Sequence, residues 1–370
     1  MTRREKALAE AKDVIDTFEL NALAYLFDGV HSYLEANPIY DLTGFKSIDC
    51  SAAIIEDNNV DLLLTPDWDV LRARECAPFY VKAVGCDDLA EVLVSRLVGV
   101  NRLGVVGLDA VPRSITDAVL RTVSEVVDVS EVVIQRQRPK DEDELIKAAR
   151  ATEIAEEAFG VLLENLRPGM AEYEVSALLD FEVRRRGADD NFLLMSSGPS
   201  GRPVHAASER RLEPGDVLNA EISPAYGYQF VQITRTIVLG RASVEQREDY
   251  ELLLRSLHAG MAAARPGVTV AEVVAEMDRP SIEAGFPEYT RPPYIRVRGH
   301  GQGIASLSPG DIVYNNNTIL EEGMMFTMHP NQPTPRSGYM MCGEPVVITA
   351  RGAQALTSQQ IRLFETGELK

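Results

Sequence analysis

The strongest constraint in this sequence is a repeated pattern in residues 138–370, where a pair of amphipathic helices is followed twice by short strands. Apolar residues recur at three- and four-residue spacing over 144–166 and 171–187, and a second predicted helix pair covers 245–267 and 270–285. The segments after each pair are rich in glycine and proline, which is typical of short strands joined by turns. Two such halves predict a pseudo-duplicated α+β domain.

Residues 1–137 follow a different pattern, in which helical and strand-like runs alternate. We expect an α/β unit with a mixed sheet there. The charged segment 138–146 predicts a linker that enters a helix N-terminus, because acidic residues suit that end of the helix dipole. The predicted domains are therefore 1–137 and 138–370. The elements expected in the first are a helix-rich stretch at 3–26, two buried strands around an Asn-Asn turn at 52–65, and strands within 102–112 and at 131–137.

The charge balance limits the classes of partner. Lys and Arg number 37 and Asp and Glu number 56, which gives a net charge of −19. Nucleic acids and anionic membrane surfaces both require a cationic protein surface, so neither is an expected partner. The sequence has no apolar run near the roughly 20 residues of a membrane span and no apolar signal core. Its four cysteines lack metal-binding spacing, and we expect a cytoplasmic protein with reduced thiols.

Three of the five histidines stand where functional groups are often found. His205, His300 and His329 each lie in a loop or strand end rich in glycine or proline, and loops held by rigid elements often carry catalytic groups. His258 lies within an amphipathic helix and predicts a surface or packing role. His31 lies in a polar segment and predicts a loop residue. The first three are therefore the candidate site histidines.

Ordered motifs connect the sequence to a known family. The chain resembles the creatinase/prolidase/methionine aminopeptidase family, peptidase family M24. This resemblance implies a creatinase-like N-terminal domain at 1–137 and a pita-bread catalytic domain at 138–370, an α+β fold overall. The motifs that carry it are YDLTGF at 40–45, SSGPSGRPVH ending at His205, GDVLNAEISPAYGYQFVQITRT at 215–236, GHGQG at 299–303, LEEGMMFTMHPN at 320–331 and GEPVVITARG at 343–352.

The chain departs from the family at the metal-ligand positions that the resemblance implies. Metal-dependent members use two Asp, one His and two Glu around a pair of divalent ions. Of these ligands only the histidine, His300, is retained unchanged. The two Asp positions hold Glu221 and Gln232, the two Glu positions hold His329 and Gly343, and Glu344 and Leu307 replace a neighbouring Asp and a further family His.

This loss leads to an expectation of no metal cofactor. Two adjacent dications need several anionic oxygens to offset their mutual repulsion, and Gln232 is neutral while Gly343 has no side chain. An alternative stays open, in which Glu221, His300 and His329 hold one divalent metal as a two-His, one-carboxylate set. The replacements are mostly polar, which favours a rebuilt site over a decayed one.

The expected function is a creatinase-like one that does not act on peptides. We expect a hydrolase, or a lytic enzyme, that cleaves a C–N bond of a small polar metabolite without the paired metal ions. His205 would move the proton, Glu221 and Glu344 would bind or activate substrate or water, and His300 and His329 would stabilise negative charge. The alternatives are a pseudoenzyme or ligand-binding protein on the same fold, and an enzyme with a single metal ion.

Substrate binding is assigned to further polar residues. Arg298 lies in RPPYIRVRGH, and a guanidinium there could clamp a carboxylate, although the pattern favours a strand with alternating exposed arginines. Tyr228 and Gln232 would line the pocket, together with the retained Arg235. The expected partner is a small-molecule substrate, and the resemblance implies a homodimer because related proteins complete the site with a neighbouring subunit.

Overall fold

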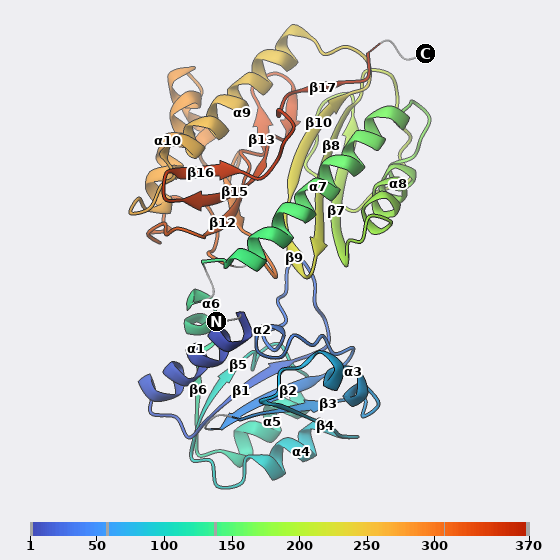
Figure 1. Ribbon diagram of the computed structural model, residues 1–370. Coiled ribbons are helices and arrows are strands. Elements are labelled where there is room, and N and C mark those ends of the chain that lie inside the picture. The colour runs from blue at the N-terminus through green and yellow to red at the C-terminus, as the bar shows by residue number, and fades with distance from the viewer. Residues whose placement is uncertain (1–2, 57–58, 137–138, 307, 368–370) are drawn as a thin grey trace. The chain divides into compact units, whose positions relative to one another are not determined.

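The structure is a computed structural model that describes residues 3–56, 59–136, 139–306 and 308–367. Asn58 of the predicted turn and Leu307 lie outside the described residues. The chain divides into two compact units (Figure 1). One contains Met1–His31 and Glu35–Gln137, and the other contains Ser32–Leu34 and Arg138–Lys370.

A mixed sheet forms the centre of the first unit. Among its described residues, six strands pair in the order β4-β3-β2-β1-β5-β6. The β1–β2 and β2–β3 pairs are antiparallel, and the others are parallel. The strands are β1 (Ala22–Phe27), β2 (Ser51–Glu56), β3 (Asn59–Leu64), β4 (Val81–Gly85), β5 (Arg102–Val106) and β6 (Glu125–Asp128).

Helices cover both faces of this sheet, so its central strand is apolar throughout. Alternate β1 side chains point to opposite faces. Leu23 and Tyr25 belong to the core under α1 and α6, whereas Ala24 and Leu26 belong to the core under α4 and α5. The helices are α1 (Arg3–Thr17), α2 (Tyr40–Thr43), α3 (Asp69–Cys76), α4 (Leu89–Arg96), α5 (Arg113–Thr122) and α6 (Ser130–Arg136).

Two details differ from the expectation for this unit. The helix-rich stretch 3–26 ends as strand β1, and the predicted strand at 131–137 is helix α6 in its described part. Asp128 Oδ1 accepts a hydrogen bond from Ser130 N and turns the chain directly after β6. Val133 is then the buried residue of α6. A short apolar run cannot distinguish a strand from a helix turn by periodicity alone.

The second unit repeats a layer of two helices against a sheet, which confirms the α+β prediction. Helices α7 and α8 pack on strands β7, β8 and β10, and α9 and α10 pack over β12 and β15 (Figure 1). The helices are α7 (Glu142–Asn165), α8 (Glu172–Arg184), α9 (Val244–Ala263) and α10 (Val270–Glu283), with a 3₁₀ turn at Pro287–Thr290.

The strands of the second unit form three groups in the described part of the chain. The pairing orders are β17-β10-β8-β7 with β9 beside β8, then β11-β12-β15-β16, and a β13-β14 hairpin. Their bounds are β7 (Asp190–Gly198), β8 (Val217–Tyr226), β9 (Gln229–Phe230), β10 (Ile233–Val238), β11 (Gly299–Gly301), β12 (Met325–Met328), β13 (Gln332–Thr334), β14 (Gly338–Met340), β15 (Glu344–Thr349), β16 (Gly352–Ala355) and β17 (Phe364–Glu365).

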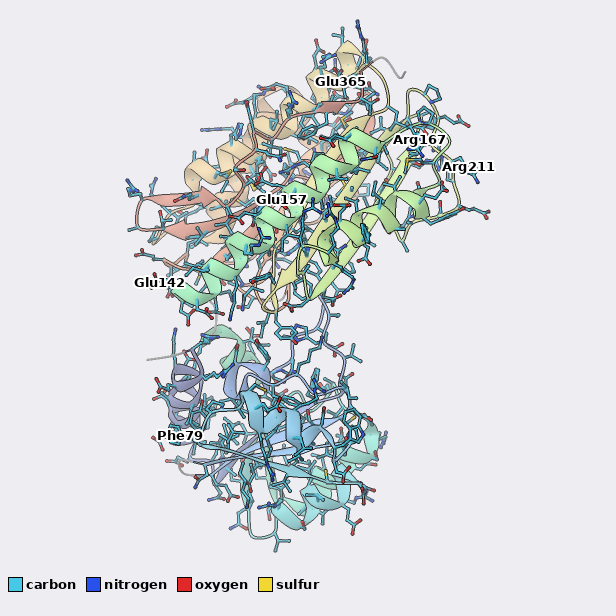
Figure 2. The ribbon with its side chains drawn as sticks, turned by 45° about the vertical axis from the view of Figure 1, so that its right-hand side comes forward. Phe79, Glu142, Glu157, Arg167, Arg211 and Glu365 are labelled. Atoms are coloured by element: carbon cyan, nitrogen blue, oxygen red, sulfur yellow. The ribbon has the colours of Figure 1, made fainter. Side chains whose placement is uncertain are left out.

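Local sequence signals fix where the long helices begin. Asp141 caps α7 by accepting from Glu144 N, and the Glu144 carboxylate accepts from Asp141 N in return. The outer face of α7 is charged, and Figure 2 labels Glu142 and Glu157 on it. None of the described helices is long and apolar enough to cross a membrane.

Candidate functional site

The two larger sheets of the second unit meet at a backbone bridge beside the predicted site residues. Thr234 on β10 and Gly343, just before β15, exchange hydrogen bonds of 3.3 Å in both directions. Glu221 lies on β8 directly opposite Thr234. This bridge therefore brings strand residues from both halves of the pseudo-duplication to one place.

A histidine pair lies at the β11-β12-β15-β16 sheet. His300 is on β11, opposite Thr327 of β12, and His329 follows the end of β12. The two ring centroids are 5.1 Å apart with planes at 65°. Burial lowers the pKa of both imidazoles, and proximity to His300 contributes to the fall of the His329 pKa to about 3. Both rings are therefore neutral at physiological pH.

Glu221 is a half-buried residue whose carboxyl group has one firmly oriented neighbour. Burial raises its pKa to about 7, against the lowering effect of a 3.3 Å hydrogen bond from Asn331 Nδ2 to Oε1. Asn331 Oδ1 accepts from Thr234 Oγ1 and from Cys342 N, at 3.2 and 3.0 Å. Because the amide oxygen is used in this way, the amide nitrogen must face Glu221.

Tyr33 lies between the histidines and the sheet that contains β8. Its hydroxyl lies 3.2 Å from His300 Nε2 and accepts a 3.0 Å hydrogen bond from Gln302 Nε2. Ser223 Oγ accepts from Gln232 Nε2 at 3.2 Å. Burial raises the pKa of Tyr33, and Ser223 and Gln302 oppose that rise. We call Tyr33, Ser223, Gln232, Glu221, Asn331, His300, Gln302 and His329 the polar cluster.

Three members of the polar cluster hold buried polar atoms without a hydrogen-bond partner in the described structure. These atoms are Gln232 Oε1, Gln302 Oε1 and His329 Nδ1. A buried polar atom without a partner costs about 1–3 kcal/mol. Native proteins rarely retain several in one place, and each therefore calls for an explanation such as a bound ligand or water.

Arg235 and Glu344 form a separate buried ion pair. Arg235 Nη2 lies 3.0 Å from Glu344 Oε1, and the side chains are 1% and 3% exposed. Arg235 Nη1 also donates to Gly343 O at 2.7 Å and to Thr234 O at 3.1 Å. Thr357 donates to the other Glu344 oxygen. This arrangement clamps the bridge between the sheets, so both charges have structural partners.

The structure places three other predicted site residues outside the polar cluster. His205 is exposed, and its Nδ1 lies 2.7 Å from Ala206 O. Arg298 is buried in a bidentate pair with Asp278, with both contacts at 2.8 Å, so its guanidinium is already matched to a carboxylate and the proposed clamp has no support. Tyr228 occupies a turn with φ of 62°, and its backbone N donates to Asp189.

Sequence reasoning missed four members of the polar cluster: Tyr33, Ser223, Gln302 and Asn331. Asn331 lies two residues after His329, within the recognised motif at 320–331. This position in the motif could have indicated that Asn331 is a site residue. Tyr33 lies in the short segment Ser32–Leu34 and joins the second unit from a distant part of the chain. No periodicity or spacing marks such a residue.

The pseudo-duplicated α+β fold therefore carries one carboxyl group and two imidazoles within the polar cluster. Residues 146–352 match the model of metallopeptidase family M24, and the chain belongs to this family. It is 28% identical to the Xaa-Pro dipeptidase of Pyrococcus furiosus over 84% of this chain and 88% of that protein. It is 30% identical to the uncharacterized peptidase YqhT of Bacillus subtilis over 63% of this chain and 66% of that protein. The crystal structure of the prolidase from Pyrococcus horikoshii OT3 superposes with a TM-score of 0.85 at 24% identity, over 99% of this chain and 100% of that one.

These comparisons correct two predictions. The prediction of a creatinase-like hydrolase that does not act on peptides is contradicted, because the relatives carry the names of peptidases and Xaa-Pro dipeptidases. The prediction of no metal cofactor is contradicted as well, since the family is one of metallopeptidases. Both errors came from giving the altered ligand positions more weight than the motifs retained around them.

The donor set of this chain nevertheless does not fit a pair of divalent ions. Within the described ranges, no three His, Cys, Asp or Glu side chains form a group that could hold a metal ion. Gln232, at one of the ligand positions, donates a hydrogen bond from Nε2 to Ser223 Oγ. At Gly343, a Cβ would lie 2.5 Å from both His329 Cβ and Thr234 Oγ1, so a longer side chain has no room there.

Replacing Gly343 with alanine tests this packing. The added methyl group would overlap His329 and Thr234, and such overpacking costs about 1–3 kcal/mol. Urea unfolding should therefore show a lower midpoint with an unchanged slope. Gly160→Ala is the matched control, because nothing lies within 4 Å of its added Cβ inside helix α7. That control should be neutral or stabilising. Equal stability of Gly343→Ala and the parent would show that the space is open.

Proposed function

We propose that the protein hydrolyses the peptide bond of short peptides, with Xaa-Pro dipeptides as the substrate class to test first. The observation that carries this proposal is the polar cluster, in which a buried carboxyl group and two neutral imidazoles stand on a peptidase fold. The chain matches 88% of the length of the Pyrococcus furiosus Xaa-Pro dipeptidase, which supports this substrate class. The predicted homodimer and cytoplasmic location stay predictions.

Glu221 supplies the proton transfer in this proposal. A carboxyl group with a pKa of about 7 is divided between its two forms near neutral pH. A general acid–base group is most effective when its pKa lies near the working pH. Glu221 would accept a proton from the attacking water and return it to the amine that leaves. Asn331 holds the carboxyl group in place by its hydrogen bond to Oε1.

The neutral side chains of the polar cluster would receive the substrate. Gln232 Oε1 and Gln302 Oε1 are acceptors without a partner among the described residues, and they suit the N–H groups of a dipeptide's terminal ammonium. His329 carries the unpartnered Nδ1 and would hydrogen-bond the carbonyl oxygen as it becomes negative. His205 is exposed, so its proposed part in proton transfer requires a loop movement.

The test is direct cleavage of dipeptides by the purified full chain. Ala-Pro and Met-Pro should release proline, whereas Ala-Ala should be cleaved more slowly. The assay is run with the protein as purified, after dialysis against a chelator, and with added manganese, so that the metal requirement is measured in the same experiment. The absence of cleavage of any dipeptide under all three conditions would overturn the proposed function.

A further inference from the structure

Tyr33 has a fixed position within the second unit. Its side chain is 3% exposed. The ring stacks on Phe192 at a centroid distance of 4.8 Å and meets the edge of Phe230 at 5.4 Å. The backbone oxygen of Tyr33 accepts from Ser306 N at 2.8 Å. The hydroxyl is therefore held by aromatic packing and by the backbone, independently of its own hydrogen bonds.

The hydrogen bonds around the Tyr33 hydroxyl all run in one direction. Gln302 Nε2 can only donate, so the Tyr33 oxygen accepts that bond. Because the Tyr33 oxygen accepts from Gln302, its own proton is available to donate. The acceptor within reach is His300 Nε2, at 3.2 Å.

The other nitrogen of His300 fixes the tautomer. His300 Nδ1 lies 3.0 Å from Gly301 O, and a carbonyl oxygen only accepts, so Nδ1 carries the hydrogen. Nε2 is then the nitrogen with the lone pair. The geometry thus gives a continuous chain of donors from Gln302, through Tyr33, to His300.

We infer that Tyr33 is a positioning residue, whose hydroxyl holds His300 in the Nδ1–H tautomer and occupies its Nε2 lone pair. The His300 ring is then fixed edge-on both to Tyr33, at 5.8 Å, and to His329, at 5.1 Å. In this state His300 orients His329 and is not itself a base. A chain of aligned hydrogen bonds is stronger than its separate members, which favours this arrangement in a buried site.

The test is the tautomer of His300 in the parent and in Tyr33→Phe. Phenylalanine keeps the packing against Phe192 and removes the hydroxyl. Long-range proton–nitrogen NMR spectra of histidine-labelled full chain distinguish the two ring nitrogens, and His300→Asn assigns the signals. In the parent, His300 should show Nδ1–H and a hydrogen-bonded Nε2. In Tyr33→Phe, the Nε2 signal should move to the position of an acceptor without a donor.

Two results would overturn the inference. One is an Nε2–H tautomer of His300 in the parent, and the other is an identical His300 spectrum in parent and Tyr33→Phe. Tyr314→Phe is the control, since that side chain is 71% exposed, and its His300 signals should match the parent. This readout does not depend on turnover, so it stands even if the proposed peptidase activity fails.

An activity readout adds the functional consequence and rests on the proposed function. Hydrogen-bond partners of metal-ligating histidines typically contribute about 10–100-fold to metal affinity or activity, and we take the lower end of that range for Tyr33. We expect Tyr33→Phe to lower kcat about 10-fold with KM within a factor of about 2, because the hydroxyl positions a ring and binds no substrate. An unchanged kcat together with a shifted His300 Nε2 signal would remove the functional part of the inference, while a loss expressed in KM alone would place Tyr33 in substrate binding.

Discussion

Arg235→Ala is expected to lower the free energy of unfolding by about 3–5 kcal/mol, because it leaves the Glu344 carboxylate buried without its cation. The native pair is 1% and 3% exposed, and the same guanidinium donates to the carbonyl oxygens of Thr234 and Gly343. Its loss therefore also frees two acceptors at the bridge between the sheets. Urea unfolding at neutral pH measures the effect.

The pH dependence of this loss of stability distinguishes the effect of the unpaired Glu344 carboxylate from the effect of lost packing. Burial raises the pKa of Glu344 even in the native protein, and Arg235 opposes that rise. Without Arg235 the pKa should rise further. A carboxyl group whose pKa is raised in the folded state contributes fully to protein stability at pH values below its ordinary pKa. This contribution is lost as pH rises through the folded-state pKa. The loss of unfolding free energy in Arg235→Ala should therefore grow as pH rises above the ordinary carboxyl pKa of 4.5.

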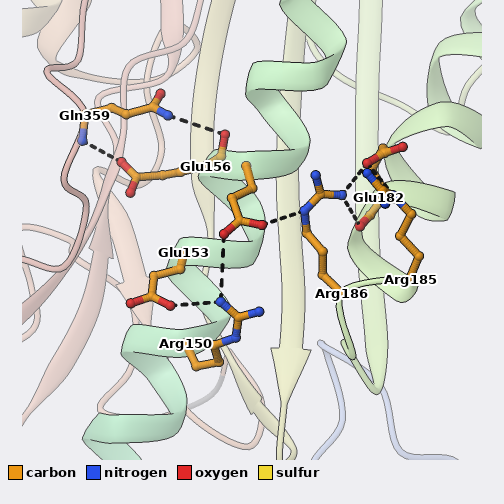
Figure 3. A network of polar contacts seen from close by, with 8 residues as sticks. Arg150, Glu153, Glu156, Glu182, Arg185, Arg186 and Gln359 are labelled. Atoms are coloured by element: carbon orange, nitrogen blue, oxygen red, sulfur yellow. Dashed lines mark hydrogen bonds and ion pairs between the residues drawn. The ribbon is translucent and has the colours of Figure 1, made fainter.

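Two controls define the outcome. Arg150 pairs with Glu153 at 2.9 Å in an exposed network on α7, which Figure 3 shows, and Arg150→Ala should cost less than about 1 kcal/mol. The double variant Arg235→Met with Glu344→Leu removes both charges and should be less unstable than Arg235→Ala alone. A single variant as stable as the Arg150 control would show that the buried pair contributes little.

Much of the fold could be predicted because it rests on local patterns. The two helix pairs have regular apolar spacing, and α7 begins at a capping box formed by Asp141 and Glu144. Short elements were harder to predict. Residues 130–136 contain a β-branched run typical of a strand, yet Asp128 turns the chain into helix α6. The decisive contact there is a single hydrogen bond that composition does not reveal.

The site was predictable where motifs keep their spacing. Glu221, Gln232, His300 and His329 all belong to the polar cluster, as the motif order indicated. The partners of charged residues were not predictable. Arg235 and Arg298 were assigned to substrate, but each is matched to a carboxylate within the protein, Glu344 and Asp278. Sequence shows that a charge is present, whereas only the tertiary structure shows which charge it meets.

Glu221→Gln is expected to lower kcat on a dipeptide substrate by about 10²–10⁴-fold, the usual contribution of a general acid–base group. Glutamine keeps the size of the side chain and cannot exchange a proton. If Glu221 acts as the base, the parent's kcat should rise with pH through the pKa of about 7. The variant should lack this step. Glu157→Gln, at a side chain that is 52% exposed, should retain full activity.

The same variant should be more stable than the parent at high pH, which provides a test independent of turnover. Glu221 has a folded-state pKa of about 7 against an ordinary 4.5, so its contribution to stability is full below pH 4.5 and is lost as pH rises to about 7. The shift corresponds to a loss of about 3 kcal/mol in the parent at pH 8. His329 behaves oppositely, because its lowered pKa costs stability as pH falls below 6.5. Subtracting the variant's curve from the parent's cancels His329 and isolates Glu221. A difference that does not change between pH 5 and 8 would show that Glu221 ionises normally, and the proton transfer would then have to be assigned to another group.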